Sequence, residues 1–142
     1  MDAARFLAAQ QDIFDQVLDE LHAGEKITHW MWFIFPQLAG LGYSAMAQRY
    51  ALDGAAEALA YLRLPVLGPR LLTCTRVVAG LATRSAHEIF GATDAVKFQS
   101  SMTLFDFVAP AGERSFADCL DIYFGGVGDP ASLMRLRQIE RA

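Results

Sequence analysis

The sequence contains few cysteines, little concentrated basic charge and no long apolar run. Cys74 and Cys119 each lie within an apolar helical pattern, so we expect two reduced, buried thiols rather than a disulfide. The net charge is -4 and the arginines are scattered, whereas phosphate contacts require a concentrated basic surface. No apolar run approaches the roughly 18 residues that span a membrane. The composition therefore predicts neither a nucleic-acid partner nor a membrane span.

The chain also shows no targeting segment, linker or repeat. Its first residues carry Asp12, Asp15 and Asp19 instead of the basic start and continuous apolar stretch of a secretory signal, so we expect the cytoplasm. The length of 142 residues and the 54% hydrophobic content suit one folded domain over residues 1–142. The three histidines share no ligand spacing, and the glycines form no nucleotide fingerprint, so we expect no metal and no cofactor.

Helical periodicity dominates the pattern, and no alternating strand pattern is present. Apolar residues between Ala3 and Ala23 recur at spacings of three and four, which predicts one amphipathic helix ended by Gly24. Gln10 interrupts the apolar face of this helix. Because a buried glutamine needs hydrogen-bond partners, we expect its amide to contact other elements.

Turn and capping signals divide the rest of the chain into further helices. Gly68-Pro69 predicts a turn, Ser85 and Glu88 have the spacing of a capping box, and Asp129-Pro130 predicts the start of the last helix. The resulting fold class is all-α. We expect a single irregular bundle or array of about seven to eight helices.

Both tryptophans lie in one apolar segment, Trp30 to Phe35, which contains no polar residue. Such a run must be buried on nearly all sides. It could form a short helix, capped by Thr28 and ended before Pro36, or a short extended segment. We favour the helix, because an isolated strand would leave its backbone groups unpaired.

Four sequence motifs resemble those of one family, and the resemblance extends over nearly the whole chain. They are His29-Trp30-Met31-Trp32-Phe33-Ile34-Phe35-Pro36-Gln37, Gly40-Leu41-Gly42, Tyr61-Leu62-Arg63-Leu64-Pro65-Val66-Leu67-Gly68-Pro69-Arg70 and Lys97-Phe98-Gln99-Ser100-Ser101-Met102-Thr103-Leu104-Phe105. They are similar to the motifs of small bacterial domains of unknown function, some of which are labelled calpastatin. The resemblance implies one mostly helical domain and assigns no catalytic or binding residue. Calpain inhibition relies on long disordered repeats, which this compact apolar composition does not resemble.

The first group of candidate binding residues surrounds the tryptophans. His29 adjoins the apolar segment, where desolvation would favour a neutral imidazole. Together with Lys26 and Gln37 it could frame a polar pocket whose floor is Trp30 or Trp32. The alternative is that His29 is a structural hydrogen-bonding residue and Lys26 a solvated loop lysine.

A second group lies further along the chain, where Lys97 and Ser101 share one helical face. Hydroxyl side chains compete for backbone hydrogen bonds in a helix, so Ser100 and Ser101 need an explanation. They could belong to a ligand site with Lys97, or Ser101 could be an activated nucleophile. We favour a helix break or a packing role at these serines.

These candidates predict a domain that binds a small, planar and anionic ligand in a pocket beside the tryptophans. The alternative is a protein-interaction or structural module, since the apolar content is high for a small monomer and a homo-oligomer is compatible with it. A catalytic role for His29 or Ser101 is a third hypothesis. The sequence does not decide whether the protein is an enzyme.

Overall fold

A computed structural model describes residues 1–141 of the protein, with side chains described through Gln138, so the end of the predicted domain, Ala142, lies outside the described residues. The described chain is helical and contains no strand. Its helices are α1 (Ala4–Gln10), α2 (Phe14–Ala23), α3 (Met31–Ile34), α4 (Ala45–Tyr50), α5 (Ala55–Arg63), α6 (Leu67–Ala79), α7 (Ala86–Phe90), α8 (Ala92–Val108), α9 (Ser115–Phe124) and α10 (Pro130–Arg141). The all-α prediction is confirmed, but ten helices replace the predicted seven to eight.

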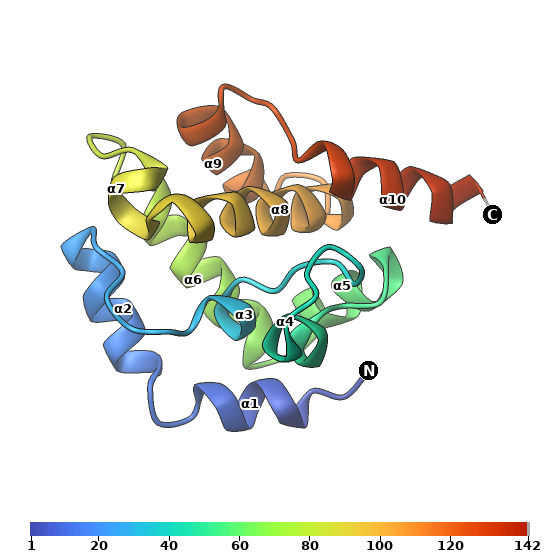
Figure 1. Cartoon of the computed structure of the whole chain (residues 1–142), viewed down its shortest axis with the longest axis horizontal. Coiled ribbons are helices and arrows are strands. Elements are labelled where there is room, and N and C mark those ends of the chain that lie inside the picture. Colours follow the sequence, from blue (N-terminus) through green and yellow to red (C-terminus); the bar gives the residue numbers. More distant parts are fainter. Residues whose placement is uncertain (142) are drawn as a thin grey trace.

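One reason for the higher number is that the predicted helix from Ala3 to Ala23 is divided into α1 and α2. The two helices pack on different partners: α1 lies against α3, while α2 lies against α6 (Figure 1). Phe6 is buried on the first helix and Leu21 on the second. The end of α2 is as predicted, since Gly24 takes the left-handed conformation there.

Gln10 is buried at the junction of α1 and α2, and its amide finds the expected partners. Its Nε2 donates to the backbone oxygen of Phe33 over 2.7 Å and lies 3.4 Å from the hydroxyl of Tyr61, while its Oε1 accepts from Arg70 over 3.4 Å. The interruption in the apolar pattern is therefore a structural hydrogen-bonding residue that joins α1 to α3, α5 and α6.

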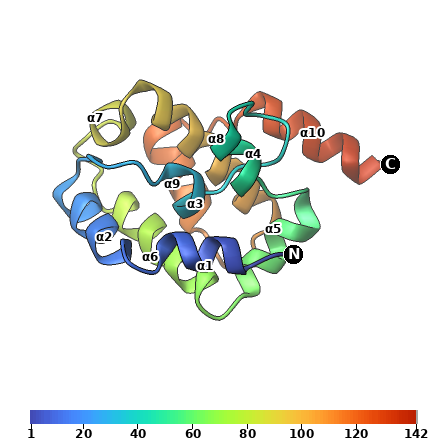
Figure 2. The same cartoon turned by 60° about the horizontal axis from the view of Figure 1, so that its bottom comes forward.

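The central element is α8, which contacts α3, α5, α7, α9 and α10 (Figures 1 and 2). Phe98, Met102 and Phe105 are fully buried along it. The predicted break at Ser100 or Ser101 is wrong, because α8 continues through both residues. Neighbouring helices surround α8, so these small side chains are buried in packing contacts, in agreement with the alternative packing role.

The tryptophan-rich segment contains one short helix, α3, as favoured over an extended segment. Its cap differs from the prediction: Trp30 occupies the N-cap position, while Thr28 directs its backbone N–H and its hydroxyl to Glu20. The following residue Phe35 packs edge-on against Phe98, with ring centroids 5.0 Å apart. The segment is thus fixed to the central helix α8.

An isolated β-bridge between Leu38 and Leu52 closes the chain excursion that carries α4. The backbone N–H of Ala39 donates to Leu52 over 2.8 Å, and the N–H of Leu52 donates to Gln37 over 2.9 Å. Both leucines are buried. Residues 39–51 therefore start and end at one closed neck, and within them Tyr50 is buried against Phe6 and Phe33.

Of the turn and capping signals after the tryptophan-rich segment, both capping signals are confirmed and the turn is not. Ser85 and Glu88 form the expected capping box, and Asp129 caps α10 by accepting from the N–H and hydroxyl of Ser132. Gly68-Pro69 is not a turn but part of the first turn of α6, where proline is tolerated. A Cβ atom at Gly68 would lie 2.1 Å from the backbone oxygen of Leu62, so close packing explains this glycine. Within residues 1–141, no helix is both long and apolar enough to span a membrane.

Candidate functional site

The first polar cluster next to the tryptophans is centred on the buried carboxylate of Glu20, on α2. Its Oε1 accepts from the indole N–H of Trp30 over 3.0 Å and from the backbone N–H groups of Ile27 and Thr28 over 2.6 and 2.9 Å. Its Oε2 accepts from the Thr28 hydroxyl over 2.6 Å and from Gln16 over 3.2 Å. Burial alone would raise the pKa of Glu20, but these hydrogen bonds stabilise the charged form and lower the pKa to about 2.

The second cluster contains both lysines of the sequence, which share one carboxylate. Lys26 Nζ lies 2.8 Å from Asp94 Oδ2, and Lys97 Nζ lies 3.7 Å from Asp94 Oδ1. Each ammonium also faces a tryptophan ring, with Lys26 5.1 Å from the centroid of Trp30 and Lys97 4.9 Å from that of Trp32. We call Lys26, Asp94 and Lys97 the lysine cluster; its charges leave an excess of one positive charge.

The two lysines differ in their access to solvent. The side chain of Lys26 is only 6% exposed, and its backbone N–H donates to Ile89 over 2.7 Å. The side chain of Lys97 is 24% exposed. Lys97 is therefore the lysine of the cluster that can contact a ligand from outside.

Lys97 lines a cleft of about 490 Å³ between the 37–47 segment, α8 and the start of α10. The first wall is formed by Gln37, Leu41, Gly42, Tyr43, Ser44 and Ala47, and the second by Thr93, Val96, Lys97, Ser100, Asp129 and Ala131. Asp129 supplies a negative charge, but its Oδ2 accepts from Ser132 at the start of α10. Lys97 is the only cationic side chain that lines this cleft within the described residues.

Tyr43 is the most exposed large apolar side chain of the cleft, at 86%. It follows Gly40-Leu41-Gly42, where Gly40 has a φ of 91° that glycine adopts without strain. The segment is held at both sides, because Arg135 on α10 donates to the backbone oxygen of Gly40 over 3.4 Å and Gln48 donates to that of Tyr43 over 2.9 Å. An aromatic ring is thus presented to solvent on a braced segment beside Lys97.

Comparison with known proteins places this architecture in a family. The family model described as "Protein of unknown function (DUF1810)" matches residues 1–136. The chain belongs to this family. Among solved structures, the chain is similar to the conserved hypothetical protein Rv1873 from Mycobacterium tuberculosis, with 45% identity, a TM-score of 0.91 and coverage of 94% of each chain. A search of the curated proteins found no match.

In this DUF1810 member, the predicted site residues fall into three groups. Gln37 and Lys97 line the cleft. Lys26 and the two tryptophans lie behind it, connected to it through the lysine cluster: Trp30 is buried and Trp32 half-buried. His29 is exposed and Ser101 is fully buried; neither lines the cleft.

Three residues of the site were not expected from the sequence: Tyr43, Val96 and Asp94. Asp94 precedes Lys97 by three positions on one helix, which is a recognisable ion-pair spacing. Its bond to Lys26, by contrast, joins residues 68 positions apart and depends on the tertiary fold. Nothing in the local pattern distinguishes Tyr43 and Val96 from other exposed residues.

The two cysteines offer little reactivity. Both are free and buried, as predicted, and burial raises the pKa of each thiol to about 12. The reactive thiolate is therefore scarce at neutral pH. Among the described residues, no group of three or more His, Cys, Asp or Glu side chains is arranged to hold a metal ion.

Proposed function

We propose that this protein binds a small organic molecule that has a planar ring and an anionic group, in the cleft beside Lys97. The observation that carries the proposal is the excess positive charge of the lysine cluster, which reaches the cleft through the more exposed of the two lysines. A cation in a partly enclosed cleft attracts an anion more strongly than one on an open surface, since water screens it less.

In this proposal, different residues of the cleft bind different parts of the ligand. Lys97 contacts the anionic group, and the exposed ring of Tyr43 stacks on the planar part. Gln37 and Ser100 line the same cleft and offer hydrogen-bonding groups to the ligand's polar atoms.

Lys26, Trp30 and Trp32 contribute indirectly in this proposal. Lys26 occupies one oxygen of Asp94, so that carboxylate is shared and does not neutralise Lys97 alone. Trp32 faces the Lys97 ammonium and helps to position it. Trp30 in turn faces Lys26. The cleft does not use His29 and Ser101, which stay predictions from the sequence, as does the cytoplasmic location.

The test is a thermal-shift series with matched pairs of probes. Benzoate, phenyl phosphate and adenosine monophosphate carry a ring and an anion, while benzamide, phenol and adenosine carry the ring alone. An anionic probe at about 100 times its dissociation constant should stabilise the protein by about 2.7 kcal/mol, which is visible as a raised melting temperature. The neutral partner of each pair should produce a smaller shift.

Variants assign any shift to the cleft. Lys97→Met should abolish the preference for the anionic probes, and Tyr43→Ala should weaken both members of each pair. Arg63→Met is the matched control, because Arg63 is exposed on α5 and does not line the cleft. Equal shifts in wild type and Lys97→Met, or no shift with any anionic probe, would contradict the proposal.

A further inference from the structure

The cleft beside Lys97 contains a second charged side chain, the half-buried carboxylate of Asp129. Its Oδ2 accepts from the backbone N–H and the hydroxyl of Ser132, over 2.8 and 2.6 Å, and so caps α10. Its Oδ1 has no hydrogen-bond partner among the residues whose side chains the structure describes. One oxygen of this carboxylate is therefore available to a donor group of the ligand.

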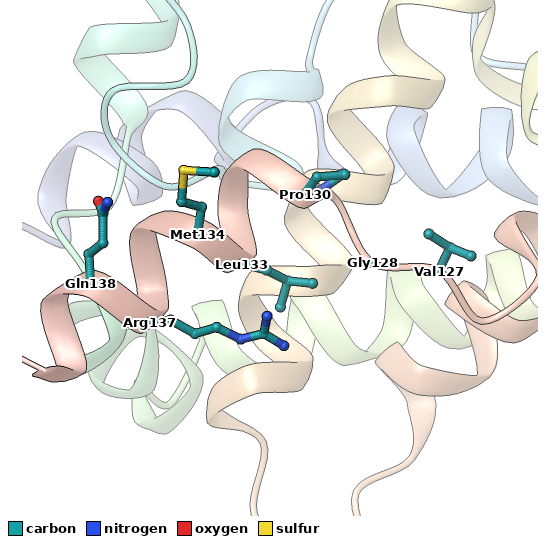
Figure 3. Close-up of a pocket in the computed structure, with 7 residues that line it drawn as sticks. All are labelled: Val127, Gly128, Pro130, Leu133, Met134, Arg137 and Gln138. Carbon is teal, nitrogen blue, oxygen red and sulfur yellow. The ribbon is translucent and has the colours of Figure 1, made fainter.

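The position of Asp129 along α8 is set by Thr103. The backbone N–H of Asp129 donates to the Thr103 hydroxyl over 2.9 Å, and that hydroxyl donates to the backbone oxygen of Gln99 over 2.8 Å. Figure 3 shows the segment that leads from Val127 to the start of α10, and Gln99 donates to the backbone oxygen of Val127 over 2.9 Å. This segment is thus tied to α8 at the level of Thr103.

Lys97 lies further towards the N-terminus of α8. It precedes Thr103 by six positions, which is about 9 Å along a helix that rises about 1.5 Å per residue. The Lys97 ammonium lies 3.7 Å from Asp94, three positions earlier still, so the side chain extends away from Asp129. Ser100 lies between the two levels and lines the same cleft. The two charged groups of the cleft are therefore separated by roughly two turns of α8, about 10 Å.

This separation determines which anions can use both groups. An α-amino acid carries its ammonium and its carboxylate on one carbon atom, so it cannot contact Lys97 and Asp129 together. A nucleoside 5′-monophosphate has its phosphate and its base at opposite ends, with the ribose between them. Adenine and cytosine also carry an exocyclic amino group, and an aspartate carboxylate accepts hydrogen bonds from such a group. The cleft volume of about 490 Å³ lies within the usual range for small-molecule sites.

We propose that the cleft binds a nucleoside monophosphate whose base carries an exocyclic amino group, with the phosphate at Lys97 and the amino group at Asp129. The inference rests on the proposed function, because it gives a chemical class to the planar anionic ligand. The lysine cluster has an excess of one positive charge, which suits one phosphate group better than a chain of several. The ribose then lies at the level of Ser100.

Asp129 acts in this proposal as the residue that selects the base. An amino group donates a hydrogen bond to the available Oδ1. In hypoxanthine and uracil a carbonyl oxygen replaces the amino group of adenine and cytosine, and it would place a lone pair against the carboxylate. The cleft should therefore reject inosine and uridine monophosphates although their charge and size are almost the same.

Isothermal titration calorimetry of the full chain with two matched pairs of nucleotides tests the selection. Adenosine and cytidine monophosphate carry the amino group, while inosine and uridine monophosphate carry the carbonyl oxygen at the same ring position. Wild type should bind the amino member of each pair about tenfold more tightly, since a hydrogen bond to a charged group is replaced by a repulsive contact.

Substitutions at the α10 cap separate base selection from helix capping. Asp129→Asn should bring the ratio of dissociation constants in each pair close to one, because an amide offers both a donor and an acceptor. Asparagine still caps a helix, so the variant should fold. Ser132→Ala is the matched control: it removes one hydrogen bond of the cap, keeps the carboxylate and should leave the ratio unchanged. Asp12→Asn, at an exposed position outside the cleft, changes the net charge equally and should leave binding unchanged.

The outcomes distinguish this inference from the proposed function. Equal binding within each pair, or discrimination that survives in Asp129→Asn, would mean that Asp129 does not select the base. Binding of phenyl phosphate without binding of any of the four nucleotides would show that the ligand belongs to another class of planar anion. Both results overturn the inference and leave the proposed function standing. Failure of phenyl phosphate as well as the nucleotides would overturn both.

Discussion

Two carboxylates lie beside the tryptophan-rich segment, and their surroundings differ sharply. Glu20 accepts five hydrogen bonds, all from donors of residues 16–30 that are close to it in sequence. Asp94 is approached by two lysines, one of them 68 positions away. Hydrogen-bond donors therefore stabilise the charge on both oxygens of Glu20, whereas Asp94 is shared between two cations.

The comparison separates a structural polar cluster from one that is suited to binding. A buried carboxylate with matched donors stabilises its charged form and has little capacity left for a ligand. The lysine cluster retains an excess positive charge, and Lys97 directs it to an open cleft. Substitutions around Glu20 should therefore affect mainly stability, and those around Asp94 should affect ligand binding as well.

The largest expected effect is that of Glu20→Gln. The amide keeps the size of the side chain but replaces one acceptor oxygen by an N–H₂ group that faces other donors. We expect the free energy of unfolding to fall by about 3 to 4 kcal/mol, measured by urea denaturation. Glu25→Gln, at an exposed neighbouring position, is the control and should change stability by less than about 0.5 kcal/mol.

A slightly smaller loss of stability is expected when the wild-type protein is acidified. The pKa of Glu20 is about 2 in the folded protein against an ordinary value of 4.5, so its contribution is complete above about pH 4.5 and is lost as the pH falls towards 2. That contribution amounts to about 3 kcal/mol. Glu20→Gln should have a shallower pH dependence of stability in this window, and parallel curves for the two proteins would contradict the role of Glu20.

Asp94→Asn should have an intermediate effect on stability. It leaves the ammonium of Lys26, whose side chain is nearly buried, without its carboxylate partner. We expect a loss of about 1 to 2 kcal/mol in urea denaturation, less than for Glu20 because the Trp30 ring still faces the cation. Asp53→Asn, at an exposed position, serves as the reference. A loss as large as that of Glu20→Gln would remove the contrast between the two carboxylates.

The smallest expected effect is on the affinity for an anionic ligand, and it comes from Lys26, which does not line the cleft. Lys26→Met leaves Asp94 to Lys97 alone, which cancels the excess charge without changing a residue of the cleft. Binding of phenyl phosphate, measured by calorimetry, should weaken about two- to fivefold, while Lys26→Arg should retain most of it. Stronger binding in Lys26→Met would show that the cluster does not supply its charge to the cleft.

Much of the fold could be predicted from local patterns. Capping signals at Ser85 and Asp129 and the apolar spacing of the helices depend on neighbours within one turn, and these predictions are confirmed. The division between α1 and α2 could not be predicted, because it follows from which helix each half packs against. The continuity of α8 through Ser100 and Ser101 likewise depends on its burial by neighbouring helices, which overrides the weak helix propensity of serine.

The candidate site was accessible to sequence reasoning only in part. Lys97 and Gln37 could be selected from the sequence because they are polar residues beside apolar motifs, and both line the cleft. Tyr43 is not distinguished by its neighbours in sequence, because its place in the cleft depends on the bridge that returns the chain at Leu52. Whether a lysine is buried, as Lys26 is, or open, as Lys97 is, also depends on contacts between distant segments.

The closed neck at Leu38 and Leu52 has a consequence for how this family could diversify. Because both leucines are buried and joined by backbone hydrogen bonds, the exposed residues between them can change without disturbing the core, whereas Tyr50, which packs on Phe6 and Phe33, has to stay. Longer insertions there would add little entropic cost, since loop closure depends only weakly on length. Relatives with the same fold could therefore acquire different ligand preferences by exchanging this one excursion, with α8 and its lysine kept in place.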